Sequence, residues 1–365
     1  MARISIDSVE GEINYQDTMK EFGIEPIDGF LKKLASRHEL SLMYRRGMVI
    51  GQRDFGQICN AIEHGRKFAV LTGVNPSGSL HLGNLLFLQQ ALFFQKLGAE
   101  VFIPVSNDET YVFKKSESLE KATENAIERV IPDIIALGFD EKKTKIFIST
   151  KTSRAYELAV KLSTKTTLST LKAIFGFDND TNPGQVFYTV MQSAHILFPQ
   201  LEEFGGPKPV VVPIGIDQDP YMRLVRDMAE KVGMIKPSST YHKFLAGLQG
   251  GKMSGSKPDT CIYLSDSPSA AKKKIMKAFS GGAASLEEHK KHGGNPDIDV
   301  ACQYLYMMFE QDDRKAEEIK EGYRKGMLSS GDVKSLLADK VTAFLSAHAE
   351  KREKAMDRIN KYVIC

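Results

Sequence analysis

Two glycine-rich segments of the sequence combine small residues with polar side chains suited to bind phosphate. In the first, TGVNPSGSLHLGN (72–84), small residues let a ligand approach the backbone, and an apolar, helix-like stretch follows. A helix starting near Leu80 would direct its free N–H groups at an anion, and His81 and Asn84 would share one of its faces. Phosphate binding and a plain glycine-rich turn before a helix are equally compatible with this segment alone.

The second glycine-rich segment, GGKMSGSKPD (250–259), contains Lys252, Ser254 and Ser256 and almost no apolar side chain. As a loop it could fold over a polyphosphate held by the first segment and supply charge and hydroxyl donors during phosphate displacement. The alternative is a solvated linker. Neither segment has the GxxxxGK[ST] pattern of a P-loop or the GxGxxG spacing of a dinucleotide fold, so the sequence does not predict either of those sites.

Carboxylates and amides at further places are suited to a small ligand that carries an ammonium group. SNDETY (106–111) follows a strand-like run, although an N-cap with an acidic first turn explains that segment alone better. Gln192 lies among apolar residues, where an unpaired amide would cost about 1–3 kcal/mol, so it is either a hydrogen-bonded core amide or a recognition group. We expect His195, three residues later, in the core or at an interface rather than at a ligand.

The segment IGIDQDPYMRLVRD (214–227) joins an apolar strand to a helix. Asp219 followed by Pro220 predicts an N-cap and the first helical position. Capping does not explain Asp217 and Gln218, which are polar residues at the end of a strongly apolar run. We therefore expect these two side chains to face a ligand.

Short apolar runs alternate with helical patterns and predict an α/β fold with a doubly wound, parallel, Rossmann-type sheet. Strands are expected at 67–74, 99–108, 145–150 and 208–217, with helices at 81–98, 118–138 and from Pro220 to about Val232. Pro132 should kink or split the second helix. Ligands of such sheets bind beyond the carboxyl ends of the strands, so the polar segments should meet at one edge.

The same patterns predict three regions. Residues 1–65 are mixed and polar and indicate an N-terminal extension, and residues 66–267 form the sheet-containing domain, interrupted by a helical insertion at about 151–205. Strand signals fade after residue 268, so residues 268–365 are expected to form an all-α domain. Its helices are expected at 268–279, 299–310, 313–326 and 331–362.

Composition is that of a globular protein, with 42% hydrophobic and 26% charged residues in 365. The formal net charge of +3 neither indicates nor excludes a nucleic-acid partner. The four cysteines are widely spaced without a nearby histidine cluster, so neither a metal site nor a disulfide scaffold is expected. No run of about 18 apolar residues and no signal peptide occurs, so we expect a cytoplasmic protein without a membrane span.

Several motifs carry a resemblance to a known family. HLGN (81–84) and KMSGS (252–256) resemble the HIGH and KMSKS motifs of class I aminoacyl-tRNA synthetases. DQDPYMRLVRD (217–227) closely resembles a segment of tryptophanyl-tRNA synthetases of the archaeal and eukaryotic branch. The resemblance runs from about residue 65 to the end, with a weaker match at 9–23. Further matches are AIFGF (173–177), KMSGSKPDTCIYLSDSP (252–268), AFSGG (278–282) and GGNPDIDV (293–300).

The resemblance implies ATP with Mg²⁺ as cofactors, tryptophan and tRNA(Trp) as partners, a homodimer, and an anticodon-binding role for residues 268–365, with no DNA partner and no metal-binding side chains. The residues implied to stabilise α-phosphoryl transfer are His81, Asn84, Lys252, Ser254 and Ser256. Those implied to bind ATP are Gly73, Asn75, Pro76, Ser77, Gly83 and Met253. Those implied to bind the amino acid are Leu71, Pro104, Glu109, Gln192, Asp217, Gln218 and Met222.

The sequence departs from the family pattern where the indole is read. Leu71 and Pro104 stand where the family has a tyrosine and a glutamine, and neither offers a side-chain hydrogen bond. Asn84 replaces the family's second histidine, and Met222 replaces a phenylalanine. Losing paired polar groups should relax specificity.

Alternatives to a tryptophan enzyme remain open at this point. In a tyrosyl enzyme the phenol-reading tyrosine and aspartate would fall at Leu71 and His195, so that pattern also fails. A paralogue that lost aminoacylation and binds RNA or protein is a second alternative. Nucleotidyl transfer to another substrate is a third, although it leaves the match in the C-terminal region unexplained.

Overall fold

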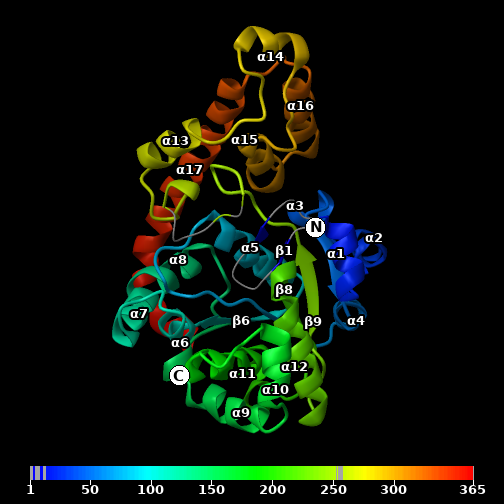
Figure 1. The fold of residues 1–365 in the computed structure, drawn as a ribbon, viewed down its shortest axis with the longest axis vertical. Coiled ribbons are helices and arrows are strands. Elements are labelled where there is room, and N and C mark those ends of the chain that lie inside the picture. Colours follow the sequence, from blue (N-terminus) through cyan, green and yellow to red (C-terminus); the bar gives the residue numbers. More distant parts are fainter. Residues whose placement is uncertain (1–2, 5–8, 11–13, 252, 254–257, 365) are drawn as a thin grey trace.

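The computed structural model describes residues 3–4, 9–10, 14–251, 253 and 258–364. Figure 1 shows a sheet-containing body with a separate group of helices above it, joined by the long helix α17, which runs from that group down to the sheet. The expected fold class is confirmed: an α/β protein with a Rossmann-type, mostly parallel sheet. Within the described residues no helix is long and apolar enough to cross a membrane.

The main sheet has the strand order β10-β7-β6-β5-β8-β9-β4-β3. Neighbours from β10 to β9 are parallel, whereas β4 pairs antiparallel with β9 and β3 antiparallel with β4. Its strands are β3 (Glu25–Pro26), β4 (Val49–Arg53), β5 (Ala69–Leu71), β6 (Glu100–Val105), β7 (Thr144–Ile148), β8 (Val210–Gly215), β9 (Ser238–His242) and β10 (Val363–Ile364). A separate two-stranded sheet joins β1 (Arg3–Ile4) and β2 (Val9–Glu10).

The direction of chain progression reverses at β5. The chain continues from β5 to β6 and β7 on one side, and later to β8 and β9 on the other. Such a switch point leaves a crevice at the carboxyl ends of the strands, because the flanking loops diverge. The crevice is therefore expected between the loops that follow β5 and β8.

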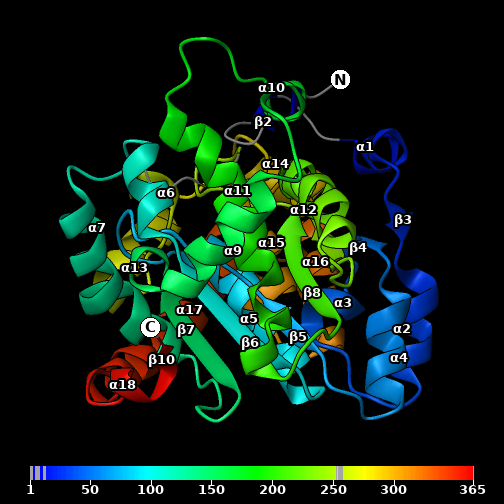
Figure 2. The same ribbon diagram turned by 90° about the horizontal axis from the view of Figure 1, so that it is seen from below.

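Each face of the sheet is covered by its own apolar core. Successive strand residues point to opposite faces, so Val70 packs into one core and Leu71 into the other. The first face is covered by α5 and α8, and the second by the insertion helices and α12, which Figure 2 shows in front of the sheet. Helices of the body are α1 (Tyr15–Phe22), α2 (Asp28–Ala35), α3 (Leu42–Arg45), α4 (Gly56–Glu63), α5 (Leu82–Lys96), α6 (Asn107–Val112), α7 (Leu119–Asn125), α8 (Ile131–Ala136) and α12 (Asp219–Lys231).

The predicted helical insertion contains α9 (Ser153–Ser163), α10 (Leu168–Phe175) and α11 (Pro183–Leu197). As expected from Pro132, the helix before the third predicted strand is interrupted: a π-helical turn, Ala126–Val130, separates α7 from α8. The C-terminal helices are α13 (Pro268–Met276), α14 (Leu286–His292), α15 (Val300–Tyr304) with a π-helical turn at Leu305–Phe309, α16 (Asp313–Arg324), α17 (Ser330–Met356) and α18 (Ile359–Tyr362).

Four elements of the fold were not expected. β3 and β4 come from the segment expected to be an N-terminal extension, and they join the sheet through β9. β9 itself was missed, as was β10, which returns the C-terminus to the edge beside β7. The division into regions at residues 65 and 267 stays a prediction, but residues 25–53 share the sheet with the residues that follow them.

Candidate active site

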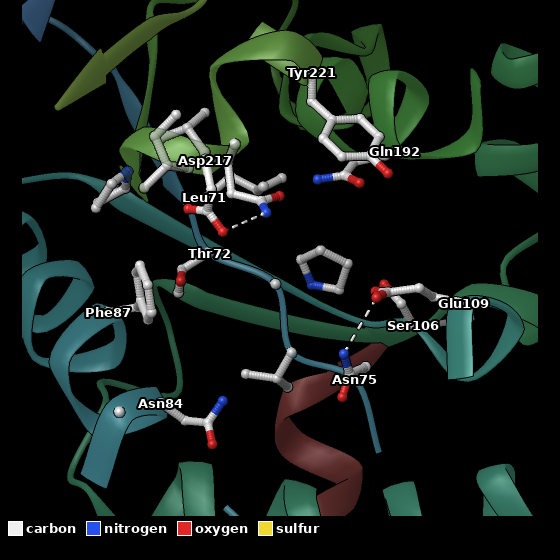
Figure 3. A pocket seen from close by; sticks show the side chains of 18 of the residues that line it. Leu71, Thr72, Asn75, Asn84, Phe87, Ser106, Glu109, Gln192, Asp217 and Tyr221 are labelled. Atoms are coloured by element: carbon white, nitrogen blue, oxygen red, sulfur yellow. Dashed lines mark hydrogen bonds between the residues drawn. The ribbon is translucent and has the colours of Figure 1, made fainter. Parts of the chain in front are cut away.

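A cavity of about 380 Å³ opens at the carboxyl ends of β5, β6 and β8, beside the first turn of α5 (Figure 3). Most of the side chains that the sequence predicted for a site line this cavity. They are Leu71, Gly73, Asn75, His81, Gly83, Asn84, Pro104, Glu109, Gln192, Asp217, Gln218, Met222 and Met253.

The other predicted residues lie elsewhere or outside the description. Pro76 is buried and Ser77 is exposed, and neither lines the cavity. The Ser77 hydroxyl donates to Asn75 Oδ1 at 3.0 Å, so it orients a residue that does line it. Lys252, Ser254 and Ser256 lie outside the described residues.

The first turn of α5 forms the anion-binding end of the cavity. The helix begins at Leu82, close to the expected start near Leu80, and His81 is its N-cap. His81 Nδ1 accepts from the Gly83 amide at 3.1 Å, and Asn84 Oδ1 accepts from the His81 amide at 3.0 Å. The two side chains therefore form a reciprocal cap, and both line the cavity, as expected for residues three apart.

This cap fixes the protonation of His81. Because Nδ1 accepts a hydrogen bond, the ring proton of the neutral imidazole is on Nε2. Burial lowers the pKa of His81 to about 4, so the ring is neutral near pH 7. His81 thus offers a fixed Nε2–H donor at the N-terminus of a helix whose dipole favours an anion.

This same turn is contacted by Met253, within the second glycine-rich segment, and by residues 262–264, which follow that segment. Met253 lines the cavity and packs closely against Gly83. A Cβ added at Gly83 would lie only 3.2 Å from Met253 Sδ. Further on, the Leu82 amide donates to Ile262 O at 3.0 Å and the Leu264 amide to Leu80 O at 2.8 Å. Residues 253 and 262–264 therefore lie next to the N-terminus of α5.

A half-buried carboxylate marks the opposite, polar end of the cavity. Glu109 Oε1 accepts from Asn75 Nδ2 at 3.2 Å and from Lys115 Nζ at 3.1 Å, and Oε2 accepts from the Tyr188 hydroxyl at 2.9 Å. Figure 3 shows Glu109 facing the cavity, with Gln192 above it. Three donors hold the carboxylate in place, an arrangement suited to binding an ammonium group beside the amide of Gln192.

The loop after β8 supplies further polar groups. Asp217 and Gln218 line the cavity as expected, and Gln218 Nε2 donates to Asp217 Oδ2 at 3.3 Å. The expected N-cap role of Asp219 was wrong: α12 begins at Asp219, and Gln218 precedes it without a side-chain cap. Asp219 is instead fully buried in an ion pair with Arg53, which the sequence did not predict because Arg53 lies far away in the chain.

The remaining wall of the cavity is apolar. It is lined by Leu71, Pro104, Ile196, Val212 and Met222. Leu71 and Pro104, which stand where the family has its polar pair, therefore both lie in this part of the site. His195 is buried, as expected, and it also lines the cavity, which the sequence analysis did not predict. The signal that could have predicted this position is that His195 follows Gln192 by three residues on α11, because residues three apart share a helix face.

Comparisons with known proteins agree with this geometry. Residues 63–346 match the family model for class I tRNA synthetases (W and Y). The chain is 42% identical to tryptophan–tRNA ligase from Sulfolobus acidocaldarius, over 97% of this chain and 93% of the relative, and 42% identical to that of Methanocaldococcus jannaschii, over 94% of each. The crystal structure of tryptophanyl-tRNA synthetase from Aeropyrum pernix K1 superposes with a TM-score of 0.90 at 36% identity, covering 96% of both chains. The chain belongs to the class I tRNA synthetases of the tryptophan and tyrosine family.

Proposed function

We propose that this protein is a tryptophan–tRNA ligase that activates tryptophan with ATP and transfers it to tRNA(Trp). One cavity joins the anion-binding turn of α5 to the ammonium-binding carboxylate Glu109, with an apolar wall between β5 and α11. That observation carries the proposal, because the reaction requires a triphosphate and an amino acid side by side. The relatives named tryptophan–tRNA ligase, at 42% identity over nearly the whole chain, support tryptophan as the amino acid.

In the proposed mechanism the tryptophan carboxylate attacks the α-phosphorus of ATP in line, giving tryptophanyl-adenylate and pyrophosphate. The terminal ribose hydroxyl of the tRNA then takes the tryptophanyl group and releases AMP. Neither step requires a protein nucleophile, so positioning and charge stabilisation provide the acceleration. Glu109, Gln192 and Gln218 orient the amino acid, while the dipole of α5, His81 Nε2–H and the Asn84 side-chain N–H groups hold the phosphates.

Magnesium would enter this site with the triphosphate. No group of three or more His, Cys, Asp or Glu side chains among the described residues could hold a metal ion. The donors around α5 are suited to phosphate oxygens, so the ion would be bound by the phosphates and neutralise their charge. Lys252, Ser254 and Ser256 would add cationic and hydroxyl contacts to the same phosphates.

The assembly and the RNA contacts are part of the proposal. Val160, Leu168 and Phe187 expose apolar side chains on the helical insertion, which supports a homodimer through that region. The C-terminal helices carry exposed lysines, among them Lys272, Lys290 and Lys291, which supports contact with the tRNA anticodon arm. The buried thiols of Cys59 and Cys302, which form no disulfide, fit the cytoplasm, where this reaction has its substrates.

Amino-acid-dependent ATP–pyrophosphate exchange without tRNA tests the proposal, comparing tryptophan, tyrosine and phenylalanine. We expect exchange with tryptophan and at least 100-fold lower kcat/KM with the other two. Exchange with tyrosine or phenylalanine would show that Leu71 and Pro104 are signs of a changed amino-acid specificity. No exchange with any of the three, by a folded protein that binds tRNA, would favour a binding module.

A further inference from the structure

The apolar end of the cavity must recognise an indole, if the proposed function holds. The indole N–H is a donor, and burying it without an acceptor sacrifices the free energy of its hydrogen bonds to water. Leu71 and Pro104 line this end of the cavity and offer no side-chain acceptor. The acceptor therefore has to come from another wall.

Helix α11 presents a stripe of three polar side chains to the cavity. Tyr188, Gln192 and His195 are spaced i, i+4 and i+7, which places them on one face, and all three line the cavity. Tyr188 is bonded to Glu109 and so marks the polar end. At 1.5 Å per residue, His195 lies roughly 10 Å further along the helix axis, toward the apolar end.

The imidazole of His195 is held in one orientation. The residue is only 2% exposed, and its Nε2 lies 3.1 Å from Ser149 Oγ, at the end of β7. The ring also packs edge-on against Phe147, with the centroids 5.7 Å apart. Among the described residues Ser149 is the hydrogen-bond partner of the ring, so Nδ1 is left for a ligand in the cavity.

The surroundings of Ser149 determine which nitrogen carries the proton. Asp108 lies beside Ser149, and burial raises the pKa of Asp108 to about 6, with the Glu109 amide and the Ser149 hydroxyl acting against that rise. Above that pH the negative charge of Asp108 beside Ser149 favours the tautomer in which Ser149 Oγ accepts from His195 Nε2–H, and the proposal takes that tautomer. Burial lowers the pKa of His195 to about 3, so the ring is neutral and Nδ1 keeps its lone pair.

We propose that His195 is the residue that selects tryptophan, with its Nδ1 accepting a hydrogen bond from the indole N–H. This inference rests on the proposed function and extends it to a recognition group that replaces the polar pair absent at Leu71 and Pro104. Ser149 acts as a positioning residue, because it fixes the tautomer and does not itself touch the substrate.

The test compares tryptophan with its benzothiophene analogue, in which sulfur replaces the N–H. The quantity measured is the ratio of the two kcat/KM values in ATP–pyrophosphate exchange. The unmodified protein should favour tryptophan roughly 10- to 100-fold, as expected for one buried hydrogen bond. His195→Phe should lower kcat/KM for tryptophan alone and so bring the ratio to within about threefold of unity. A change confined to packing would instead affect kcat/KM for both substrates.

Two further variants serve as controls. His195→Asn places an amide oxygen near the position of Nδ1 and should restore part of the preference. His195→Leu, a second variant without an acceptor, should behave as His195→Phe does and carries the test if the phenylalanine variant does not fold. Because the sequence contains no tryptophan, binding of the substrate can also be followed by its own fluorescence.

The outcomes separate this inference from the proposed function. Suppose that the unmodified protein shows tryptophan-dependent exchange and that His195→Phe and His195→Leu keep its preference for tryptophan over the benzothiophene. That result would overturn the role of His195 and leave the proposed function intact. An equal loss with both substrates would also overturn it, since that is the result of a purely structural role. An unmodified protein without tryptophan-dependent exchange would overturn both.

Discussion

Arg53 at the end of β4 and Asp219 at the start of α12 form a buried ion pair. Arg53 Nε lies 2.8 Å from Asp219 Oδ1, and Nη2 lies 3.0 Å from Oδ2. Arg53 Nη1 also donates to Gly23 O at 2.9 Å, and the Tyr241 hydroxyl donates to the same carboxylate. The pair therefore joins the N-terminal segment to the residue that follows Gln218, and gives that segment a part in shaping the site.

This arrangement predicts unequal effects for the two arginines that contact Asp219. Arg53→Ala should lower the free energy of unfolding by about 3–5 kcal/mol, because it removes the bidentate cation and leaves the buried carboxylate with only the Tyr241 hydroxyl and the half-exposed Arg223. Arg223 also contacts Asp219, at 3.2 Å, but its side chain is 51% exposed, so Arg223→Ala should cost under about 1 kcal/mol. Urea denaturation of both variants measures the difference. Equal losses would show that the burial of the Arg53 pair has no energetic consequence.

A second prediction concerns the loop that this pair supports. Gln218→Ala should weaken tryptophan binding roughly 10- to 100-fold, because it removes a hydrogen bond to a charged group of the amino acid. Gln185→Ala is the control, since Gln185 is on α11 but does not line the cavity. Tryptophan fluorescence titration gives both affinities. An unchanged affinity in Gln218→Ala would show that this side chain does not contact the ligand.

Local patterns predicted the parallel strands β5 to β8, because such strands are apolar nearly throughout and glycine or proline marks their ends. β9 could not be predicted this way: its sequence is SSTYH, and it is buried only because β8 and β4 flank it. The role of Asp219 depends on Arg53, 166 residues away, which no local pattern reveals. His195 is buried as expected, but its place in the cavity wall could not be predicted, since a histidine on an apolar helix face has the same local pattern in a core and in a cavity wall.

The environment of His81 predicts how stability depends on pH. An unfolded histidine has a pKa near 6.5, whereas burial lowers the pKa of His81 in the folded protein to about 4. Between these values the unfolded chain binds more protons, so stability falls as the pH drops from about 6.5 to about 4. From pH 7 to pH 5 this site should account for a loss of up to about 2 kcal/mol.

The variant His81→Asn isolates this contribution. Asparagine is a good N-cap and does not titrate, so the variant should lose less stability than the unmodified protein between pH 7 and pH 5. Denaturation at both pH values measures the difference. If the two proteins lose equal stability, His81 has an ordinary pKa and is exposed to solvent in the folded state.

The last prediction concerns Lys252, which lies outside the described residues although both of its flanks are placed. Met253 lines the cavity, and residues 262–264 pair with residues 80–82 beside the α5 N-terminus. We expect the lysine that precedes Met253 in the sequence to contact phosphates bound at that turn, where negative charge on the departing pyrophosphate is greatest in the transition state. Lys252→Ala should therefore slow adenylate formation by about 100-fold or more and leave tryptophan affinity within about twofold.

Single-turnover formation of the adenylate measures the first quantity, and tryptophan fluorescence measures the second. Lys272→Ala is the control, because Lys272 is an exposed lysine on α13, and it should leave adenylate formation unchanged. A uniform loss of rate and tryptophan affinity in Lys252→Ala would indicate that the segment helps to form the amino-acid site. Near-normal adenylate formation would mean that residues 250–259 are a linker, and that His81 and Asn84 at the N-terminus of α5 supply the phosphate contacts on their own.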